Sequence, residues 1–305
     1  MRAVLVVVAS VVLALGCGSK GGGSGKPKVA VSIFPLYDVT RRVAGDRLDV
    51  LLVLPPGKSE HGYDPAPKEI ARLEGAKLGL AVGLDMDGWV ENILRIADGA
   101  KIVRLGDKVQ TLAIAVEPIS EEEANEHEHE HEHGDVGAPD PHFWLDPQRM
   151  LGVIDQIEVE LAAVDPAGKE AFAANAKTLK AQLAEVDGTI AARSKAWTKH
   201  TIVTFHGSMS YFAKRYGVRI AAVVEPIAGK EPTAAYIAEV LEAVKRGKAV
   251  ALFTEPQLDK GPGEMIAREA GIPLGELDPV GGVGGRESYE KLLLWNTAQL
   301  EKVLR

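Results

Sequence analysis

Residues 165–196 read DPAGKEAFAANAKTLKAQLAEVDGTIAARSKA, and this stretch decides the fold. Its apolar side chains recur at steps of four and three, which keeps them on one face of an α-helix. They are Phe172, Ala176, Leu179, Leu183, Val186 and Ile190. Asp165 followed by Pro166 is typical of an N-cap and a first helical residue. A helix over residues 166–196 would be about 45 Å long. In a chain of 305 residues, we expect so long a helix to bridge two lobes.

On both sides of this helix, apolar strands alternate with amphipathic segments, a pattern that indicates βαβ units and mostly parallel sheets. The expected strands are residues 28–34, 48–54, 78–82, 101–105, 201–205, 220–224 and 249–254. The other expected helices are residues 37–44, 67–73, 89–97, 147–163, 209–216, 233–245, 263–270 and 289–304. The predicted fold class is α/β, with two lobes, each a mostly parallel sheet flanked by helices, joined by one long bridging helix. The predicted boundaries are 28–165 for the first lobe, 166–196 for the helix and 197–305 for the second lobe.

The N-terminal segment predicts export and lipid attachment. Arg2 precedes an apolar run over residues 3–15, which is too short for a membrane span of about 20 residues. Small residues and then Cys17, the single cysteine of the chain, follow this run. The pattern resembles a bacterial lipoprotein signal, with residues 1–16 removed and Cys17 lipidated. Residues 17–27 then form a Gly- and Ser-rich tether. We therefore expect an extracytoplasmic protein, anchored to a bacterial membrane in the periplasm or at the cell surface.

The charge of the chain argues against nucleic acid as a partner and draws attention to one loop. The formal net charge is −8, whereas phosphate binding needs patches of Lys and Arg. Residues 117–137 are acidic, lack aromatic side chains and should be a disordered loop inserted in the first lobe. The loop contains four alternating histidines: His127, His129, His131 and His133. They predict a second, weaker zinc site; the alternative is a solvated acidic tract without function.

Three of the four remaining histidines lie in distinctive segments. His61 lies in PPGKSEHGYDPAP, His142 in DPHFWLDP and His206 in VTFHGSMSYFAKRYG. Ligand sites of open α/β sheets collect where strands run out into loops, and imidazole is a preferred zinc ligand. The spacing is too long for a local zinc motif, so each histidine taken alone is ordinary. His200 has no such segment around it, and we expect it at the surface.

Together with LDPVGG at residues 277–282, these three segments resemble the zinc and manganese binding proteins of ABC importers, of the ZnuA/TroA type. The resemblance implies a metal bound between two α/β lobes, with His61, His142 and His206 at metal-binding positions. Manganese members tend to have a carboxylate where this chain has His206. Nitrogen suits Zn²⁺ better than Mn²⁺, so zinc is the expected metal. The fourth ligand is left open: Asp278 is preferred, and Glu60 or water are the alternatives.

The resulting functional hypothesis is transport without catalysis. A monomer tethered to the membrane would capture Zn²⁺ and deliver it to the permease of an ABC transporter. Since the ligands must be neutral imidazoles, affinity should fall as the pH drops through about 6.5. One alternative is a manganese or iron binding protein of the same family, and another is a surface adhesin with the same fold. A zinc hydrolase is disfavoured, because the sequence contains no G-x-S-x-G, and H-E-x-x-H occurs only within the alternating His-Glu run at residues 127–133.

Overall fold

The structure is a computed structural model that describes residues 25–96, 100–114, 137–227 and 229–305. The predicted signal segment, Cys17 and most of the tether lie outside these residues. The same holds for most of the acidic loop, with His127, His129, His131 and His133. Among the helices of the described part, none is both long and apolar enough to cross a bilayer.

The first sheet has four parallel strands in the order β2-β1-β3-β4. Its strands are β1 (Lys28–Val31), β2 (Asp49–Leu52), β3 (Ala76–Ala81) and β4 (Lys101–Arg104). Its helices are α1 (Phe34–Ala44), α2 (Pro67–Arg72), α3 (Gly88–Ile96), α4 (Pro147–Val164) and the short 3₁₀ turns η1 (Leu105–Lys108) and η3 (Phe143–Leu145). Because side chains alternate along a strand, Val29 and Val31 pack on the α1 and α4 face, and Ala30 faces the opposite side with Val90 of α3.

The second sheet repeats this order with β6-β5-β7-β8, again all parallel. Its strands are β5 (Thr201–Thr204), β6 (Arg219–Val223), β7 (Leu252–Thr254) and β8 (Leu274–Glu276). Its helices are α6 (Ser210–Tyr216), α7 (Ala234–Gly247), α8 (Gly261–Ala270), α9 (Tyr289–Leu304) and the 3₁₀ turn η5 (Gly207–Met209). Strand β8 was not predicted, because its three residues, one of them Gly275, show no alternation of apolar and polar side chains. The two-lobe α/β prediction is confirmed.

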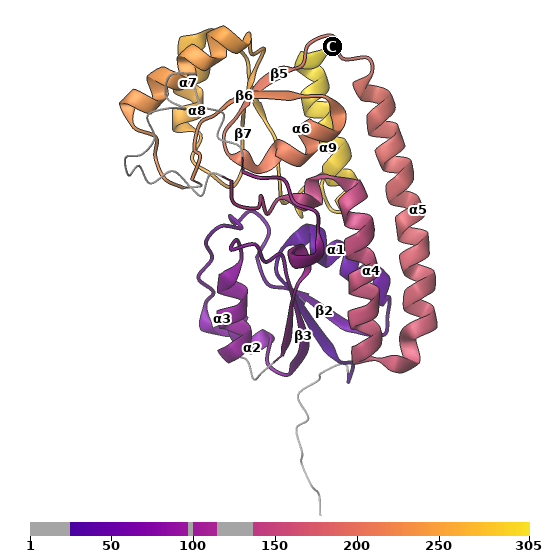
Figure 1. The fold of residues 1–305 in the computed structure, drawn as a ribbon. Coiled ribbons are helices and arrows are strands. Elements are labelled where there is room, and N and C mark those ends of the chain that lie inside the picture. The colour runs from indigo at the N-terminus through magenta and orange to yellow at the C-terminus, as the bar shows by residue number, and fades with distance from the viewer. Residues whose placement is uncertain (1–24, 97–99, 115–136, 228) are drawn as a thin grey trace, which may run out of the picture.

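The long helix is α5 (Lys169–Ser194), which runs beside both lobes (Figure 1). From the predicted start at Pro166, the first three residues form the 3₁₀ turn η4 (Pro166–Gly168), and the α-helical part begins at Lys169. Asp165 does not cap the helix with its side chain; its carboxylate accepts a hydrogen bond from Arg47 Nε at 2.7 Å instead. At 26 residues, α5 is about 39 Å long. The predicted apolar stripe is buried except for Val186, which is only half-buried.

A buried carboxylate on this stripe connects α5 to the second lobe. Asp187 accepts hydrogen bonds from the Arg215 guanidinium and, at 2.9 Å, from the Tyr216 hydroxyl, both on α6. Gln148 of α4 donates to the same carboxylate at 2.8 Å. Desolvation by itself would raise the pKa of Asp187, but these hydrogen bonds outweigh it and lower the pKa below its usual value. The ionised carboxylate therefore ties three helices together.

Two further hydrogen bonds join the lobes beside the cleft. Trp144 Nε1 in the first lobe donates to the carbonyl oxygen of Pro279 in the second at 2.7 Å. The hydroxyl of Tyr211 on α6 donates to the carbonyl oxygen of Asp140 at 2.7 Å. All four residues are buried, so water competes little for these hydrogen bonds. They fix the relative position of the segments that carry the candidate site.

Candidate metal centre

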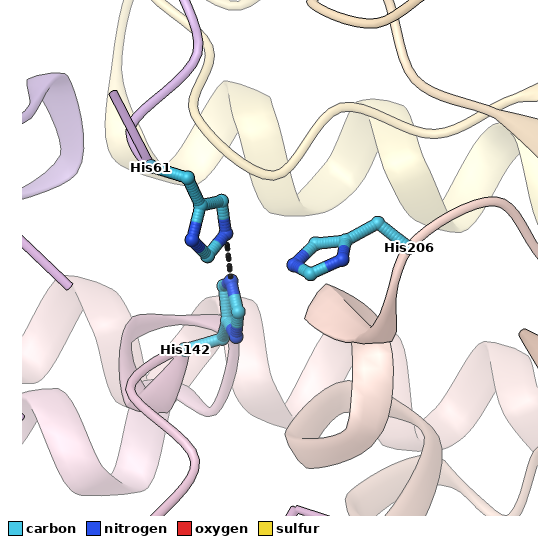
Figure 2. Close-up of side chains that lie close together, drawn as sticks. All are labelled: His61, His142 and His206. Atoms are coloured by element: carbon cyan, nitrogen blue, oxygen red, sulfur yellow. Dashed lines mark hydrogen bonds between the residues drawn. The ribbon is translucent and has the colours of Figure 1, made fainter. Parts of the chain in front are cut away.

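Three imidazoles meet in the cleft between the lobes (Figure 2). His61 lies on the irregular segment between β2 and α2, His142 directly precedes η3, and His206 follows β5 by two residues. One ring nitrogen from each lies within 4.8 Å of the others. His61 Nε2 and His142 Nε2 are 3.2 Å apart. Tetrahedral zinc with Zn–N bonds of about 2.0–2.1 Å places its nitrogen ligands about 3.3 Å apart. The spacing therefore fits a shared divalent cation.

Hydrogen bonds outside the cluster determine which ring nitrogen faces the cation position. His142 Nδ1 lies 2.8 Å from Asp140 Oδ1, and an ionised carboxylate can only accept. Nδ1 of His142 therefore carries the proton, and Nε2 presents its lone pair to the cluster. His206 Nδ1 lies 3.3 Å from the carbonyl oxygen of Glu225, with the same consequence for its Nε2. Both rings are oriented for ligation before a cation arrives.

The cluster favours neutral imidazoles. Burial, followed by the proximity of His206 and His142, lowers the pKa of His61 to about 2. Burial and the neighbouring His142 lower the pKa of His206 to about 3. Desolvation and like charge both oppose the imidazolium form. Protons were expected to compete with the metal for these imidazoles near pH 6.5. For His61 and His206, this competition therefore begins only at much lower pH.

The two candidate carboxylates differ in their surroundings. Glu60 is 2% exposed, its Oε1 lies 4.0 Å from His61 Nε2, and burial raises its pKa. Asp278 is fully buried, and its Oδ2 lies 3.2 Å from Arg286 Nη1. Within the described residues, the compact group of ligand atoms contains the three histidines but neither carboxylate. The Glu60 side chain is next to the cluster, whereas the Asp278 side chain has a cationic partner of its own.

Two buried side-chain atoms at the cluster lack a hydrogen-bond partner among the described residues, and both are suited to bind a cation. His206 Nε2 and Glu60 Oε1 are buried and have no hydrogen-bond partner in the described part of the chain. Buried acceptors without a partner are rare because desolvating them costs free energy. A divalent cation at the cluster would satisfy both at once. Nitrogen ligands with one carboxylate are a donor set that Zn²⁺ accepts readily.

A cavity connects the cluster with the outside. Its volume is about 820 Å³, and it is lined by all three histidines and, among others, by Asp85, Arg95 and Asp107. Its walls come from both lobes, since Pro226 and Ile227 also line it. The cavity is much larger than a metal ion, so it gives a hydrated cation a path to the imidazoles.

Several residues at the site were not identified from the sequence. Asp140 orients His142, and the hydroxyl of Tyr211 holds the Asp140 segment by donating to its carbonyl and accepting from Leu112 N at 2.9 Å. The only signal for Asp140 is its position two residues before the histidine in DPH. Tyr211 lies on another lobe, so no local pattern connects it with His142. His200 is exposed, as expected, with Nδ1 3.1 Å from the carbonyl oxygen of Gly217.

Two parallel α/β lobes joined by a long helix, with potential ligands converging in the cleft, define a two-lobed solute-binding protein. The chain belongs to the family described as zinc-uptake complex component A, periplasmic, whose profile matches residues 29–303. The resemblance stated from the sequence is thereby confirmed. Members of this family are solute-binding components of ABC importers and not enzymes, which agrees with the expected absence of catalysis.

Two curated relatives are lipoproteins. The zinc-binding lipoprotein AdcA of Streptococcus pneumoniae is 28% identical over 282 residues, covering 92% of this chain. The chain spans only 56% of the length of AdcA. The iron ABC transporter substrate-binding lipoprotein MtsA of Streptococcus pyogenes is 29% identical over 319 residues, covering 100% of this chain and 98% of MtsA.

The fold also matches solved structures. A zinc-bound ZnuA with residues 138–173 of its own chain deleted superposes with a TM-score of 0.77 at 22% identity. The match covers 92% of this chain and 98% of that one. At this identity the likeness establishes the fold alone.

Proposed function

We propose that this protein captures Zn²⁺ outside the cytoplasm and delivers it to the permease of an ABC importer. The observation that carries the proposal is the convergence of His61, His142 and His206, with one nitrogen of each within 4.8 Å of the others. The first two belong to one lobe and the third to the other, so a bound ion would link the lobes. Family membership supports the transport role.

Glu60 is our preferred fourth ligand, which reverses the preference for Asp278 drawn from the sequence. Its Oε1 has no hydrogen-bond partner in the described chain and lies 4.0 Å from His61 Nε2. With three neutral imidazoles, an ionised Glu60 reduces the charge of the zinc site from +2 to +1. A cation at the site would also favour the ionised form of this carboxyl and lower its pKa.

Zinc is preferred over manganese and iron on the chemistry of the ligands. Three imidazole nitrogens suit Zn²⁺, whereas Mn²⁺ favours carboxylate, carbonyl and water oxygens. The names of the relatives do not decide the matter, since AdcA is called zinc-binding and MtsA an iron transporter component. The preference for zinc over manganese therefore rests on His206, which offers a nitrogen ligand from the second lobe.

The remaining parts of the proposal concern segments outside the described residues. We propose that Cys17 carries the lipid anchor, and that the protein acts as a monomer at the outer side of a bacterial membrane. We also propose that His127, His129, His131 and His133 form a weaker, secondary zinc site. The composition of this tract predicts an entropic cost of ordering on binding, so its affinity should be lower than that of the cleft.

The test is metal analysis of the purified full chain together with zinc titration against a competing chelator. We expect one tight site and weaker sites in addition, with only the tight site left when residues 126–133 are deleted. His206→Ala should remove the tight site and keep the weaker ones. Tight binding of manganese without zinc would contradict the proposal. In cells, deleting the gene should impair growth on scarce zinc, and added zinc should restore it.

A further inference from the structure

We infer that Arg286 is a specificity-determining residue, which withholds the carboxylate of Asp278 from the cation and so keeps the site rich in nitrogen. The inference rests on the proposed zinc-binding function and adds a residue to it. It explains how a buried carboxylate beside the cleft can be kept out of the ligand set.

One oxygen of Asp278 is fully engaged within the second lobe. Oδ1 accepts hydrogen bonds from Gln257 Nε2 at 2.8 Å, Val280 N at 3.0 Å and Gly281 N at 2.9 Å. A carboxylate oxygen with three donors has no capacity left for a cation. Only Oδ2 is available, and it has no hydrogen-bond partner of good geometry among the described residues.

That second oxygen faces Arg286. Its guanidinium Nη1 lies 3.2 Å from Asp278 Oδ2 and 3.6 Å from Glu276 Oε1. The guanidinium also lies over the ring of Trp295, 4.2 Å from the ring centre. The Arg286 side chain is only 12% exposed. It contacts the carboxylates of Glu276 and Asp278 and the aromatic ring of Trp295.

The backbone explains why this arginine returns to Asp278. Gly282 N donates to the carbonyl oxygen of Arg286 at 3.0 Å, and Arg286 N donates to that of Val283 at 2.8 Å. These bonds close a tight turn after the LDPVGG segment. Gly281 and Gly282 have φ values of 77° and 82°, a region that favours glycine. The turn therefore places the guanidinium eight residues downstream against the aspartate.

Asp278 nevertheless belongs to the surroundings of the metal centre. Trp144 Nε1 donates to the carbonyl oxygen of Pro279, the next residue, at 2.7 Å. The ring of Trp144 in turn lies 5.2 Å from the ring of His142, centre to centre. Without its arginine, the Asp278 carboxylate would be a buried anion near the segment of Trp144 and His142. Such an anion is costly unless a cation compensates it.

The consequence is a choice between cations. A ligand set of imidazoles and one glutamate favours Zn²⁺, whereas an additional carboxylate oxygen moves the preference toward Mn²⁺. Arg286 thus disfavours manganese binding by forming an ion pair, at 3.2 Å, with the oxygen that manganese would use. It acts through Asp278 and does not touch the ion itself.

The experiment measures zinc and manganese dissociation constants of the full chain by chelator competition, for wild type and Arg286→Gln. Arg246→Gln on α7 is the control, since Arg246 is exposed and its loss changes the net charge equally. We expect Arg286→Gln to raise manganese affinity relative to zinc by about tenfold or more, the usual scale for outer partners of metal ligands. Arg246→Gln should change the ratio little.

Cobalt(II) absorption provides a direct reading of the ligand set. Wild type should give the strong visible bands of a tetrahedral ion, and Arg286→Gln the weaker bands of higher coordination. Adding Asp278→Asn to Arg286→Gln should restore both the wild-type bands and the wild-type manganese-to-zinc ratio. A folded Arg286→Gln variant with an unchanged ratio and unchanged bands would overturn the inference, even though zinc binding itself persisted.

A second variant covers the case in which Arg286→Gln does not fold. Asp278→Asn alone should change zinc affinity by less than the roughly tenfold cost of losing an outer partner, because Asp278 is withheld from the ion. A loss of about a hundredfold or more would show that Asp278 ligates zinc despite its arginine, and the inference would fail. If wild type bound no zinc at all, the proposed function would fail instead, so the two failures are distinguishable.

Discussion

The two lobes have sheets of identical strand order but very different residues at the carboxyl ends of their strands. In the second lobe, His206, Glu225, Glu255 and Asp278 follow β5, β6, β7 and β8 within two residues, and all are buried. In the first lobe, the residues directly after the strands are Ser32, Val53, Val82 and Leu105, all buried and none ionisable. The second lobe therefore presents an ionisable edge to the cleft, and the first lobe an uncharged one.

The first lobe contributes its ligands from irregular segments instead. The segment of His61 is held where Trp89 Nε1 donates to the carbonyl oxygen of Glu60 at 3.0 Å. His142 is held by Asp140 through two hydrogen bonds, from its own backbone N at 2.9 Å and its Nδ1 at 2.8 Å. One backbone topology therefore serves two roles in this protein. In the second lobe, the ionisable residues follow the strands directly. In the first lobe, the strands support irregular segments that carry the ligands.

The largest expected effect tests whether both lobes ligate the ion. His206→Ala and His142→Ala should each weaken zinc binding by more than about a hundredfold. Loss of a residue that only supports a ligand already costs up to about a hundredfold, and these two residues are ligands themselves. Chelator competition measures the constants, and His200→Ala is the control because this histidine is exposed and outside the cluster. If only His142→Ala had an effect, the ion would belong to the first lobe alone.

The next effect compares one buried carboxylate from each lobe. Glu60→Gln should weaken zinc binding by roughly a hundredfold, since a unit charge about 4 Å away at an effective ε of 20 is worth several kcal/mol. Glu255→Gln should have a much smaller effect. Glu255 accepts from Ser208 Oγ at 2.6 Å, and burial raises its pKa well above the usual range, which favours the neutral form. Equal losses in titration calorimetry would contradict the assignment of Glu60 as ligand.

A smaller effect tests the support of His142. In Asp140→Asn, an amide, which can both donate and accept, replaces a carboxylate that only accepts. The tautomer of the His142 ring is then no longer fixed. We expect a loss of about tenfold in zinc affinity. Tyr211→Phe, which removes the hydroxyl that donates to the Asp140 carbonyl, should show a weaker loss in the same assay. An unchanged affinity in Asp140→Asn would mean that packing alone orients the imidazole.

The smallest effect is on the pH dependence of folding stability without metal. Folded His206 has a pKa of about 3, whereas an unfolded histidine titrates near 6.5. Lowering the pH from about 7.5 to about 5.5 therefore protonates this residue only in the unfolded chain and destabilises the fold. Its contribution over this pH range is roughly 1 kcal/mol, present above the unfolded pKa and lost as the pH falls toward the folded one.

Urea unfolding with a chelator present can isolate that contribution. Wild type should lose roughly 1 kcal/mol more of its free energy of unfolding than His206→Asn over this pH range. Comparing the two chains removes the dependence that other groups, including Glu60 and Glu255, contribute to both. Identical pH profiles for the two proteins would show that His206 is not buried as a neutral ring.

The sequence carried the features that depend on local periodicity and on local motifs. The apolar stripe of α5, seven of the eight described strands and the last helix at residues 289–304 could be read from spacing alone. The three histidines could be read only with the motifs around them, because each is ordinary by itself. Where the local signal was short, as at β8, or ambiguous, as at Asp165, the prediction failed or shifted by a few residues.

The tertiary structure decided which side chains are partners. Whether Asp278 faces a cation or Arg286, and whether Glu60 keeps a free oxygen, depends on turns and contacts that local spacing does not encode. The burial of Asp187 on an otherwise apolar stripe follows from Arg215 on a different helix. Ionisable groups are governed by desolvation and by partners distant in sequence. The residue types that can bind a metal are therefore visible in the chain itself, and the charge balance that selects among them arises only on folding.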